Sequence, residues 1–167
     1  MKKCSVLFLF ISLTAQSWGQ PWIKTQLNEQ VSVNFPSIPE IQKIGNKKVY
    51  QIAGPDYVIS VLTIDMNSVP SFDVHSGELD NFYKGVIEGR MDVAADCKLL
   101  HESEIKLGKY EGREIKYTKD FNGVDDMLVT SRIVLVGKGL FTFDFWDLSK
   151  KGQKKLIKKL FKSIHLN

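Results

Sequence analysis

Residues 113–164 read REIKYTKDFNGVDDMLVTSRIVLVGKGLFTFDFWDLSKKGQKKLIKKLFKSI. Residues 113–121 alternate between apolar and polar side chains, a period of two that is typical of a half-buried strand. The pair Asn122-Gly123 favours a tight reversal. A run rich in β-branched residues over 127–136 and a run with three phenylalanines over 140–146 indicate two further strands. The segment therefore predicts an antiparallel meander of three strands with one apolar face.

One amphipathic helix follows the meander. Its apolar stripe recurs at intervals of three and four residues and comprises Leu156, Ile157, Leu160, Phe161 and Ile164. We expect this stripe to cover the sheet, with Ser149 as the N-cap residue. Lysines at 154, 155, 158, 159 and 162 occupy the rest of the circumference. They are either a solvated face or a patch for anionic lipid or an acidic partner.

The N-terminus has the parts of a secretory signal peptide. Two lysines precede an apolar run over residues 5–13, which is too short to span a bilayer. Ser17 and Gly19 then place small residues before the expected cleavage site. We expect residues 1–19 to be removed and residues 20–167 to form a single domain. The mature protein is expected to be exported, periplasmic or secreted, and to have no transmembrane segment.

Composition narrows the class of protein. A hydrophobic content of 43% and a charged content of 25% are typical of a globular chain. Without the two lysines of the signal, 21 basic residues face 19 acidic ones, and this near-neutral balance argues against nucleic-acid binding. Once Cys4 is removed, Cys97 is alone, which excludes an intramolecular disulfide and a zinc–thiolate cluster. We expect Cys97 to be buried and inert, the alternative being a reactive thiol or an intermolecular bridge. We expect the protein to be a monomer.

The upstream residues predict the rest of a sheet and a second helix. Alternating or apolar runs predict strands over 31–35, 49–53, 57–66 and 97–107, and an apolar stripe predicts a helix between 71 and 95. The run over 57–66 is apolar at nearly every position, as expected for a strand that is covered on both faces. We therefore predict the α+β class. The expected architecture is an α-β-α sandwich with a central, mainly antiparallel sheet of about seven strands and two principal helices.

Three details belong to this prediction. Residues 21–30 are expected to form a lead-in segment. Residues 37–40 are expected to form a proline-punctuated loop, which cannot continue a central strand. Gly85 and Gly89 each cost the first helix about 1 kcal/mol relative to alanine. One interpretation of these glycines is that they let the helix lie close to the sheet.

Three short motifs add information beyond periodicity. Residues 31–39, VSVNFPSIP, form a strand and an FP-x-x-P loop, residues 103–114, SEIKLGKYEGRE, form two strands around a glycine-containing turn, and residues 161–164, FKSI, end a helix. Together they resemble the PsbP/Mog1-like superfamily, in particular its small exported bacterial proteins. The resemblance implies an α-β-α sandwich around an antiparallel sheet. Members serve as accessory proteins of photosystem II or as regulators of a small nuclear GTPase, but the motifs are structural and carry over no functional residue.

Catalytic chemistry has little support in the sequence. Nucleophilic catalysis requires a Ser or Cys beside a His base that an acid orients. His75, His101 and His165 belong to three separate predicted elements, and neither a G-x-S-x-G elbow nor a phosphate-binding glycine loop is present. We expect each histidine to be an ordinary surface or structural residue, and we expect no cofactor.

One polar turn carries oxygen ligands. Asp120, Asn122, Asp125 and Asp126 bring three carboxylates and an amide into one hairpin, a donor set that suits Ca²⁺. The spacing departs from an EF-hand, because the glycine comes too early and no glutamate closes the loop. Two interpretations stay open: a plain polar turn and a weak cation site.

The sequence alone does not identify the function. The first hypothesis is an exported, non-enzymatic binding or accessory module whose partner is a protein or a cell-envelope component. It predicts an exposed, partly apolar face. The alternative is a small-ligand or divalent-cation carrier that uses a helix-sheet pocket or the loop over 120–126. A third hypothesis, a hydrolase, requires two histidines, or a histidine and several acids, to converge in space.

Overall fold

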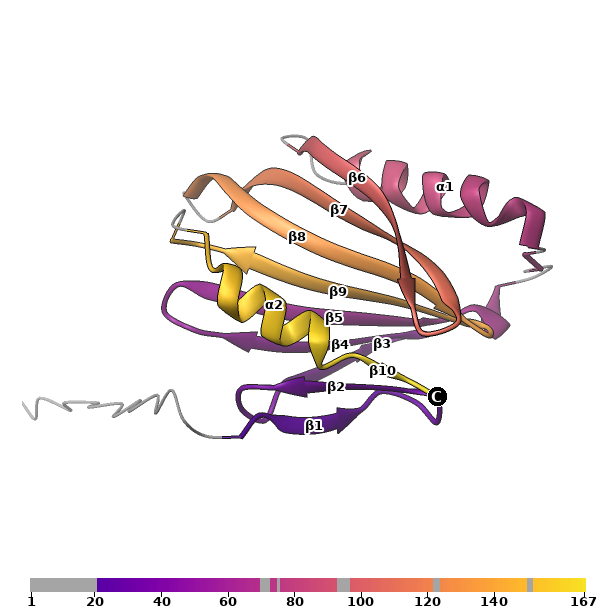
Figure 1. Cartoon of the computed structure of the whole chain (residues 1–167), viewed down its shortest axis with the longest axis horizontal. Coiled ribbons are helices and arrows are strands. Elements are labelled where there is room, and N and C mark those ends of the chain that lie inside the picture. Colours follow the sequence, from indigo (N-terminus) through magenta and orange to yellow (C-terminus); the bar gives the residue numbers. More distant parts are fainter. Residues whose placement is uncertain (1–20, 70–72, 75, 93–96, 122–123, 150–151) are drawn as a thin grey trace, which may run out of the picture.

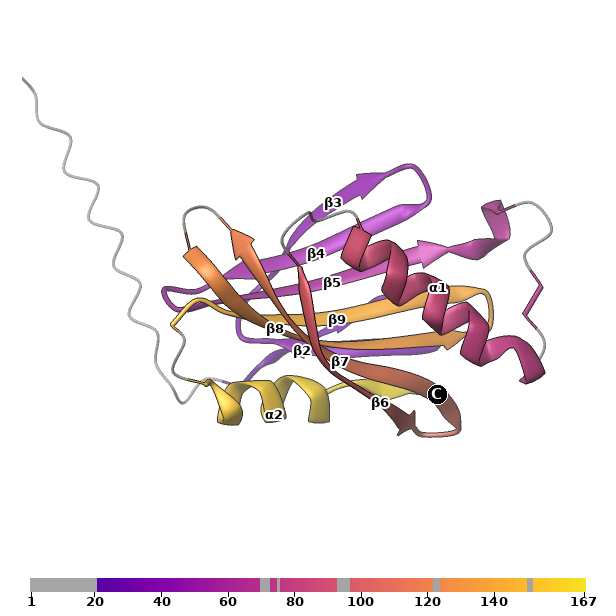
Figure 2. The same cartoon turned by 90° about the horizontal axis from the view of Figure 1, so that it is seen from above.

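A seven-stranded antiparallel sheet forms the centre of the fold, and one helix covers each of its faces (Figures 1 and 2). The computed structural model describes residues 21–69, 73–74, 76–92, 97–121, 124–149 and 152–167, so the predicted signal peptide lies outside the described residues. The strands of this sheet are β3 (Glu40–Ile44), β4 (Lys47–Ala53), β5 (Tyr57–Asp65), β6 (Lys98–Leu107), β7 (Tyr110–Phe121), β8 (Val124–Val136) and β9 (Gly139–Asp147). Their spatial order is β3-β4-β5-β9-β8-β7-β6. The predicted α+β sandwich is therefore confirmed.

A second, smaller sheet lies against one face of the first. It consists of β1 (Ile23–Gln26), β2 (Val31–Phe35) and β10 (His165–Leu166), in the order β1-β2-β10. The helices are α1 (Leu79–Asp92) and α2 (Lys154–Lys162), with two short 3₁₀ turns, η1 (Met66–Ser68) and η2 (Ser76–Glu78). Among the described residues, neither helix has the length and apolar character needed to cross a membrane.

Sequence periodicity does not predict β1, β3 or β10. β1 falls in the expected lead-in segment, and β3 begins at Glu40, the last residue of the expected loop. All five side chains of β3 are exposed, so no apolar alternation marks it, and its pairing with β4 decides its structure. β2 has its predicted bounds, but it pairs with β1 and β10 rather than with the central sheet.

Two hydrophobic clusters hold the layers together. The first joins β2, the sheet and α2, and it includes Val31, Val33, Phe35, Phe141, Phe143, Phe145, Leu160 and Phe161. The second joins α1 to the opposite face, and it includes Tyr83, Ile87, Ile115, Val129 and Ile133. Each fully buried side chain of this size contributes about 1.5–3 kcal/mol. The predicted coverage by Leu160 and Phe161 and the shared face of the three phenylalanines are confirmed. β5 contributes Ile59 to the first cluster and Ile64 to the edge of the second, as expected for a strand covered on both faces.

The prediction that Ser149 is the N-cap of α2 is wrong. The helix begins at Lys154, and its N-cap residue Gln153 makes no side-chain capping bond. The buried carboxylate of Asp147 organises the approach to the helix instead. It accepts hydrogen bonds from the backbone N–H of Ser149 at 3.0 Å, the hydroxyl of Ser149 at 2.7 Å and the backbone N–H of Gln153 at 3.1 Å.

A tyrosine anchors α1 on the sheet. The buried hydroxyl of Tyr83 donates a hydrogen bond to the carbonyl of Glu111 at 2.7 Å and accepts one from the N–H of Leu135 at 2.9 Å. The interpretation of Gly85 and Gly89 as points of close approach is wrong. Both are exposed, and a Cβ added at either position would meet nothing within 4 Å.

The motifs at 103–114 and 161–164 have structural explanations. A Cβ on Gly112 would lie 2.5 Å from the backbone oxygen of Ile133, so only glycine lets these two strands pair closely there. The hydroxyl of Ser163 accepts a hydrogen bond from the N–H of Asn34 at 3.1 Å and donates one to the carbonyl of Leu160 at 2.7 Å. It thereby ties the end of α2 to β2.

Candidate binding site

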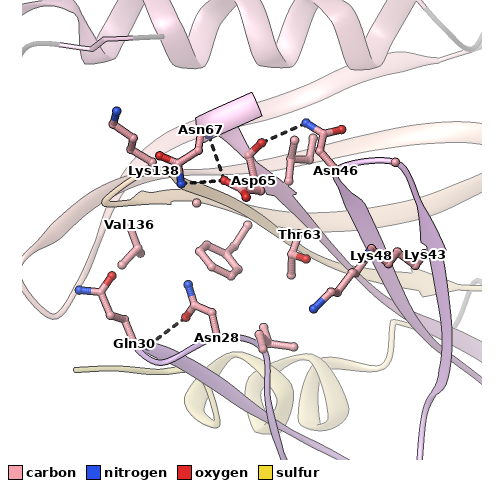
Figure 3. Close-up of a pocket in the computed structure, with 15 residues that line it drawn as sticks. Asn28, Gln30, Lys43, Asn46, Lys48, Thr63, Asp65, Asn67, Val136 and Lys138 are labelled. Carbon is pink, nitrogen blue, oxygen red and sulfur yellow. Dashed lines mark hydrogen bonds between the residues drawn. The ribbon is translucent and has the colours of Figure 1, made fainter. Parts of the chain in front are cut away.

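A pocket of about 540 Å³ opens between the central sheet and the small sheet (Figure 3). Four segments that are far apart in sequence form its walls: the β1–β2 turn, the β3–β4 hairpin, the end of β5 with η1, and the β8–β9 turn. The buried side chains of Leu27, Val136 and Phe141 give it an apolar base. We call it the inter-sheet pocket.

The polar lining of the inter-sheet pocket is positively charged. Lys43, Lys48 and Lys138 line it, and Asp65 is the acidic residue of the lining. Lys43 lies directly opposite Lys48 across the β3–β4 hairpin, and Lys48 lies opposite Thr63 on β5. The register of three strands therefore places these side chains on one face.

Hydrogen bonds hold several of the remaining side chains in place. Asp65 Oδ1 accepts from both the backbone N–H and the side-chain amide of Asn67, each at 2.9 Å. The side-chain amide of Asn46 donates to the carbonyl of Asp65 at 3.0 Å. Across the pocket, Asn28 Oδ1 accepts from the N–H groups of Gln30 at 3.0 Å and Val31 at 2.8 Å. The walls are therefore ordered before any ligand arrives.

A smaller hollow lies between helix and sheet, where the carrier hypothesis expects one. It measures about 370 Å³ and is lined by residues of α1 and β6, among them Ile87, Met91 and Leu99. It has fewer polar side chains than the inter-sheet pocket, so the latter offers more specific contacts to a polar ligand.

Exposed isoleucines gather at the β3 edge of the central sheet. Ile38 is 80% exposed, Ile41 60% and Ile44 67%, and all three lie within seven residues. β3 ends the strand order of the described sheet, so one side of its backbone has no neighbouring strand among the described residues. This is the exposed, partly apolar feature that the first hypothesis predicts.

A buried polar network lies beneath α1. Arg90 donates to Asp144 Oδ2 at 2.8 Å and to the hydroxyl of Tyr117 at 3.2 Å, and Ser131 donates to Asp144 Oδ1 at 2.5 Å. Burial lowers the pKa of Arg90, but the charges of Asp144 and Tyr117 and the hydrogen bonds to both of them together outweigh this effect, so the pKa is raised. Burial, with the nearby Asp144, raises the pKa of Tyr117 to about 12. Arg90 and Tyr117 therefore keep their protons over the physiological range. The hydrogen bonds of the network join α1 to the sheet.

Comparison with known proteins bears on the fold. No family model and no curated protein matches the sequence, whereas solved structures do. The solution structure of cyanobacterial PsbP (CyanoP) from Synechocystis sp. PCC 6803 superposes with a TM-score of 0.57 over 93% of this chain and 99% of that chain, at 12% sequence identity. The chain has a PsbP-like fold. PA94 from Pseudomonas aeruginosa, a protein of unknown function, superposes with a TM-score of 0.50 over 82% of this chain and 90% of that chain, at 11% identity.

Within the PsbP-like fold, the predicted cation loop joins β7 to β8. The backbone N–H of Asp126 donates to the carboxylate of Asp120 at 2.8 Å, and Asp126 has a φ of 51°. Asn122 lies outside the described residues, and the side chain of Asp125 is not described either. Among the residues that the structure describes, no group of three or more potential ligands converges to hold a metal. The cation loop stays a prediction.

The PsbP-like fold separates two of the three histidines. His101 is exposed on β6 of the central sheet, and His165 is exposed on β10 of the small sheet. His75 lies outside the described residues. Cys97, expected to be buried, is half-buried and packs against the second hydrophobic cluster.

The inter-sheet pocket was not predicted, because its residues are scattered along the sequence. One local signal for it exists. A two-residue turn at Gly45-Asn46 places Lys43 opposite Lys48, since Ile44 then pairs with Lys47. The other walls depend on how the small sheet lies against the PsbP-like core, which no local pattern reveals.

Proposed function

We propose that this protein is an exported, non-enzymatic binding module that docks an extended segment of a partner protein along the edge strand β3. Export is supported by the signal-like N-terminus, and the single observation that carries the docking proposal is the exposed isoleucine group at this edge. Ile41 and Ile44 are three residues apart on one strand, so they project to opposite faces of the sheet. A strand added to the edge contacts both faces, and its backbone satisfies the unpaired groups of β3.

The opposite edge of the sheet is a weaker site for strand addition. β6 also exposes two apolar side chains, Leu99 and Leu100. However, a register irregularity between Leu99 and His101 disturbs the strand at this point, and charged residues occupy much of its remainder. Bulges and charges are features that protect edges from pairing. In contrast, the pairing of β3 with β4 keeps one register from Glu40 to Ile44.

Site-specific photo-crosslinking in living cells tests the proposal. A photoreactive amino acid at position 41 is expected to join the chain to one envelope or secreted protein, and Ile44→Lys is expected to remove that product. The same probe at Leu100 serves as the matched control, because Leu100 is also exposed on an edge strand. Identical products from positions 41 and 100, or none from position 41, would contradict the proposal. If the crosslinked product is a dimer of this chain, then the β3 edge binds a second copy of the same protein instead of a different partner.

A further inference from the structure

Two lysines face each other at the inter-sheet pocket without a compensating charge. Lys43 and Lys48 are directly opposed in the β3–β4 register and both line the pocket. Directly opposed residues have Cβ atoms about 4.5–5.5 Å apart, and like charges in such pairs destabilise a sheet. Within the described residues neither ammonium group forms an ion pair. The unliganded hairpin therefore holds two positive charges together at a cost in stability.

The rest of the lining does not neutralise this charge. Lys138 adds a third basic residue from the β8–β9 turn, although its ammonium group is turned away from the middle of the pocket (Figure 3). Three basic residues therefore accompany one acidic residue, Asp65, and the net charge of the lining is +2. Asp65 Oδ1 already accepts two hydrogen bonds from Asn67. The pocket therefore carries excess positive charge, and one oxygen of its carboxylate is already hydrogen-bonded to Asn67. Such a pocket attracts an anion.

A neutral donor adds to the ammonium groups. Because Asn28 Oδ1 accepts two backbone hydrogen bonds, its amide nitrogen, with two N–H donors, is left to point away from the turn. Figure 3 shows this nitrogen turned toward the middle of the pocket, toward which the Lys48 side chain also reaches from β4. The donors therefore come from both sheets and suit a ligand that is rich in acceptors.

The dimensions indicate an organic ligand. A volume of about 540 Å³ lies within the usual range of small-molecule sites, roughly 300–1,000 Å³, and exceeds what a single inorganic ion fills. The apolar base formed by Leu27, Val136 and Phe141 suits a short carbon skeleton. We propose that the inter-sheet pocket binds a small organic anion with at least two negative charges, either a polycarboxylate or a phosphate ester. This proposal does not depend on the partner docked at β3.

Isothermal titration calorimetry of the purified protein tests the proposal with three probes: citrate, glucose 6-phosphate and inorganic phosphate. Citrate or glucose 6-phosphate is expected to bind more tightly than inorganic phosphate, and added salt is expected to weaken binding. Lys48→Gln is expected to lower the affinity roughly tenfold, which corresponds to about 1.4 kcal/mol. Lys47→Gln is the matched control, because Lys47 neighbours Lys48 but does not line the pocket.

Each outcome has a distinct meaning. Binding of citrate alone supports a carboxylate ligand, and binding of glucose 6-phosphate alone supports a phosphate ester. The proposal is overturned if neither organic probe binds, or if Lys47→Gln weakens binding as much as Lys48→Gln. If inorganic phosphate binds as tightly as the organic anions, the site binds small ions without recognising a carbon skeleton. That result would also overturn the proposal. Lys48→Gln should not lower the stability of the unliganded protein, which separates lost binding from lost structure.

Discussion

Arg90 on α1 donates a hydrogen bond of 2.8 Å to the carboxylate of Asp144, which lies near the middle of β9. The side chain of Asp144 is only 7% exposed, so its charge depends on Arg90 and on the hydroxyl of Ser131 for compensation. This ion pair links α1 to the centre of the sheet, and a second pair, between Asp80 and Arg113, links α1 to β7. Removing one member of the Arg90–Asp144 pair leaves the other charge buried without its partner.

Asp144→Ala should therefore lower the free energy of unfolding by about 3–5 kcal/mol, measured by urea denaturation. The matched control is Glu88→Ala, which breaks the ion pair between Lys84 and Glu88 at 4.0 Å on the surface of α1. Since those side chains are 74% and 64% exposed, the control should change stability by less than about 1 kcal/mol. Equal effects of the two substitutions would show that the Arg90–Asp144 pair does not hold α1 to the sheet.

Tyr117 makes stability depend on alkaline pH. Burial, aided by Asp144, raises its pKa from 10.0 to about 12, so between these values the folded protein binds more protons than the unfolded chain. The stabilisation that this tyrosine contributes is therefore complete below pH 10 and is lost as the pH rises toward 12. The loss should amount to about 1.4 kcal/mol per pH unit within this window.

The comparison of wild type with Tyr117→Phe isolates this effect, because burial also raises the pKa values of Tyr50, Tyr57 and Tyr83. Urea denaturation at about pH 9 and about pH 11 should show a smaller alkaline loss of stability for Tyr117→Phe. Absorbance titration should show that the variant lacks one late-titrating tyrosine. An unchanged alkaline slope would mean that Tyr117 titrates normally in the folded state.

Two glycines should respond to alanine in opposite directions. Gly112→Ala should destabilise the protein by about 1–3 kcal/mol, because the added Cβ meets the backbone oxygen of Ile133 at 2.5 Å. Gly85→Ala should stabilise it by about 0.5–1 kcal/mol, because the position is helical, exposed and open. Thermal unfolding of both variants measures the difference. If Gly85→Ala is destabilised instead, then α1 requires a glycine at position 85, as the sequence-based interpretation proposed.

The core role of α2 can be tested at Phe161. This ring is 5% exposed within the first hydrophobic cluster, and the guanidinium of Arg132 lies 4.4 Å from its centroid. Phe161→Ala should lower the free energy of unfolding by about 3–5 kcal/mol. Lys158→Ala, on the exposed side of the same helix, should change it by no more than about 0.5 kcal/mol. Similar values for both variants would mean that α2 adds little to the core.

Local patterns predicted the elements whose burial alternates along the chain. The three phenylalanines of β9 and the stripe that contains Leu160 and Phe161 repeat at the periods of a strand and a helix, and those periods report directly which face is buried. β3 was not predicted because all of its side chains are exposed, so its sequence has no alternation between buried and exposed positions. Only its pairing with β4 defines it as a strand. The N-cap of α2 was misplaced because Asp147 is a competing acceptor two residues before Ser149.

The sequence by itself determined the class of fold, the meander over β7, β8 and β9, and the apolar face of α2, because each depends on neighbours within a few residues. Only the tertiary structure decided the inter-sheet pocket and the Arg90–Asp144 pair. Their members lie on separate elements, and the distances between them follow from strand register and from how α1 and the small sheet lie on the core. Contacts of this kind produce no periodic pattern in the sequence. They are made by side chains that are distant in sequence and that meet only after the layers have packed.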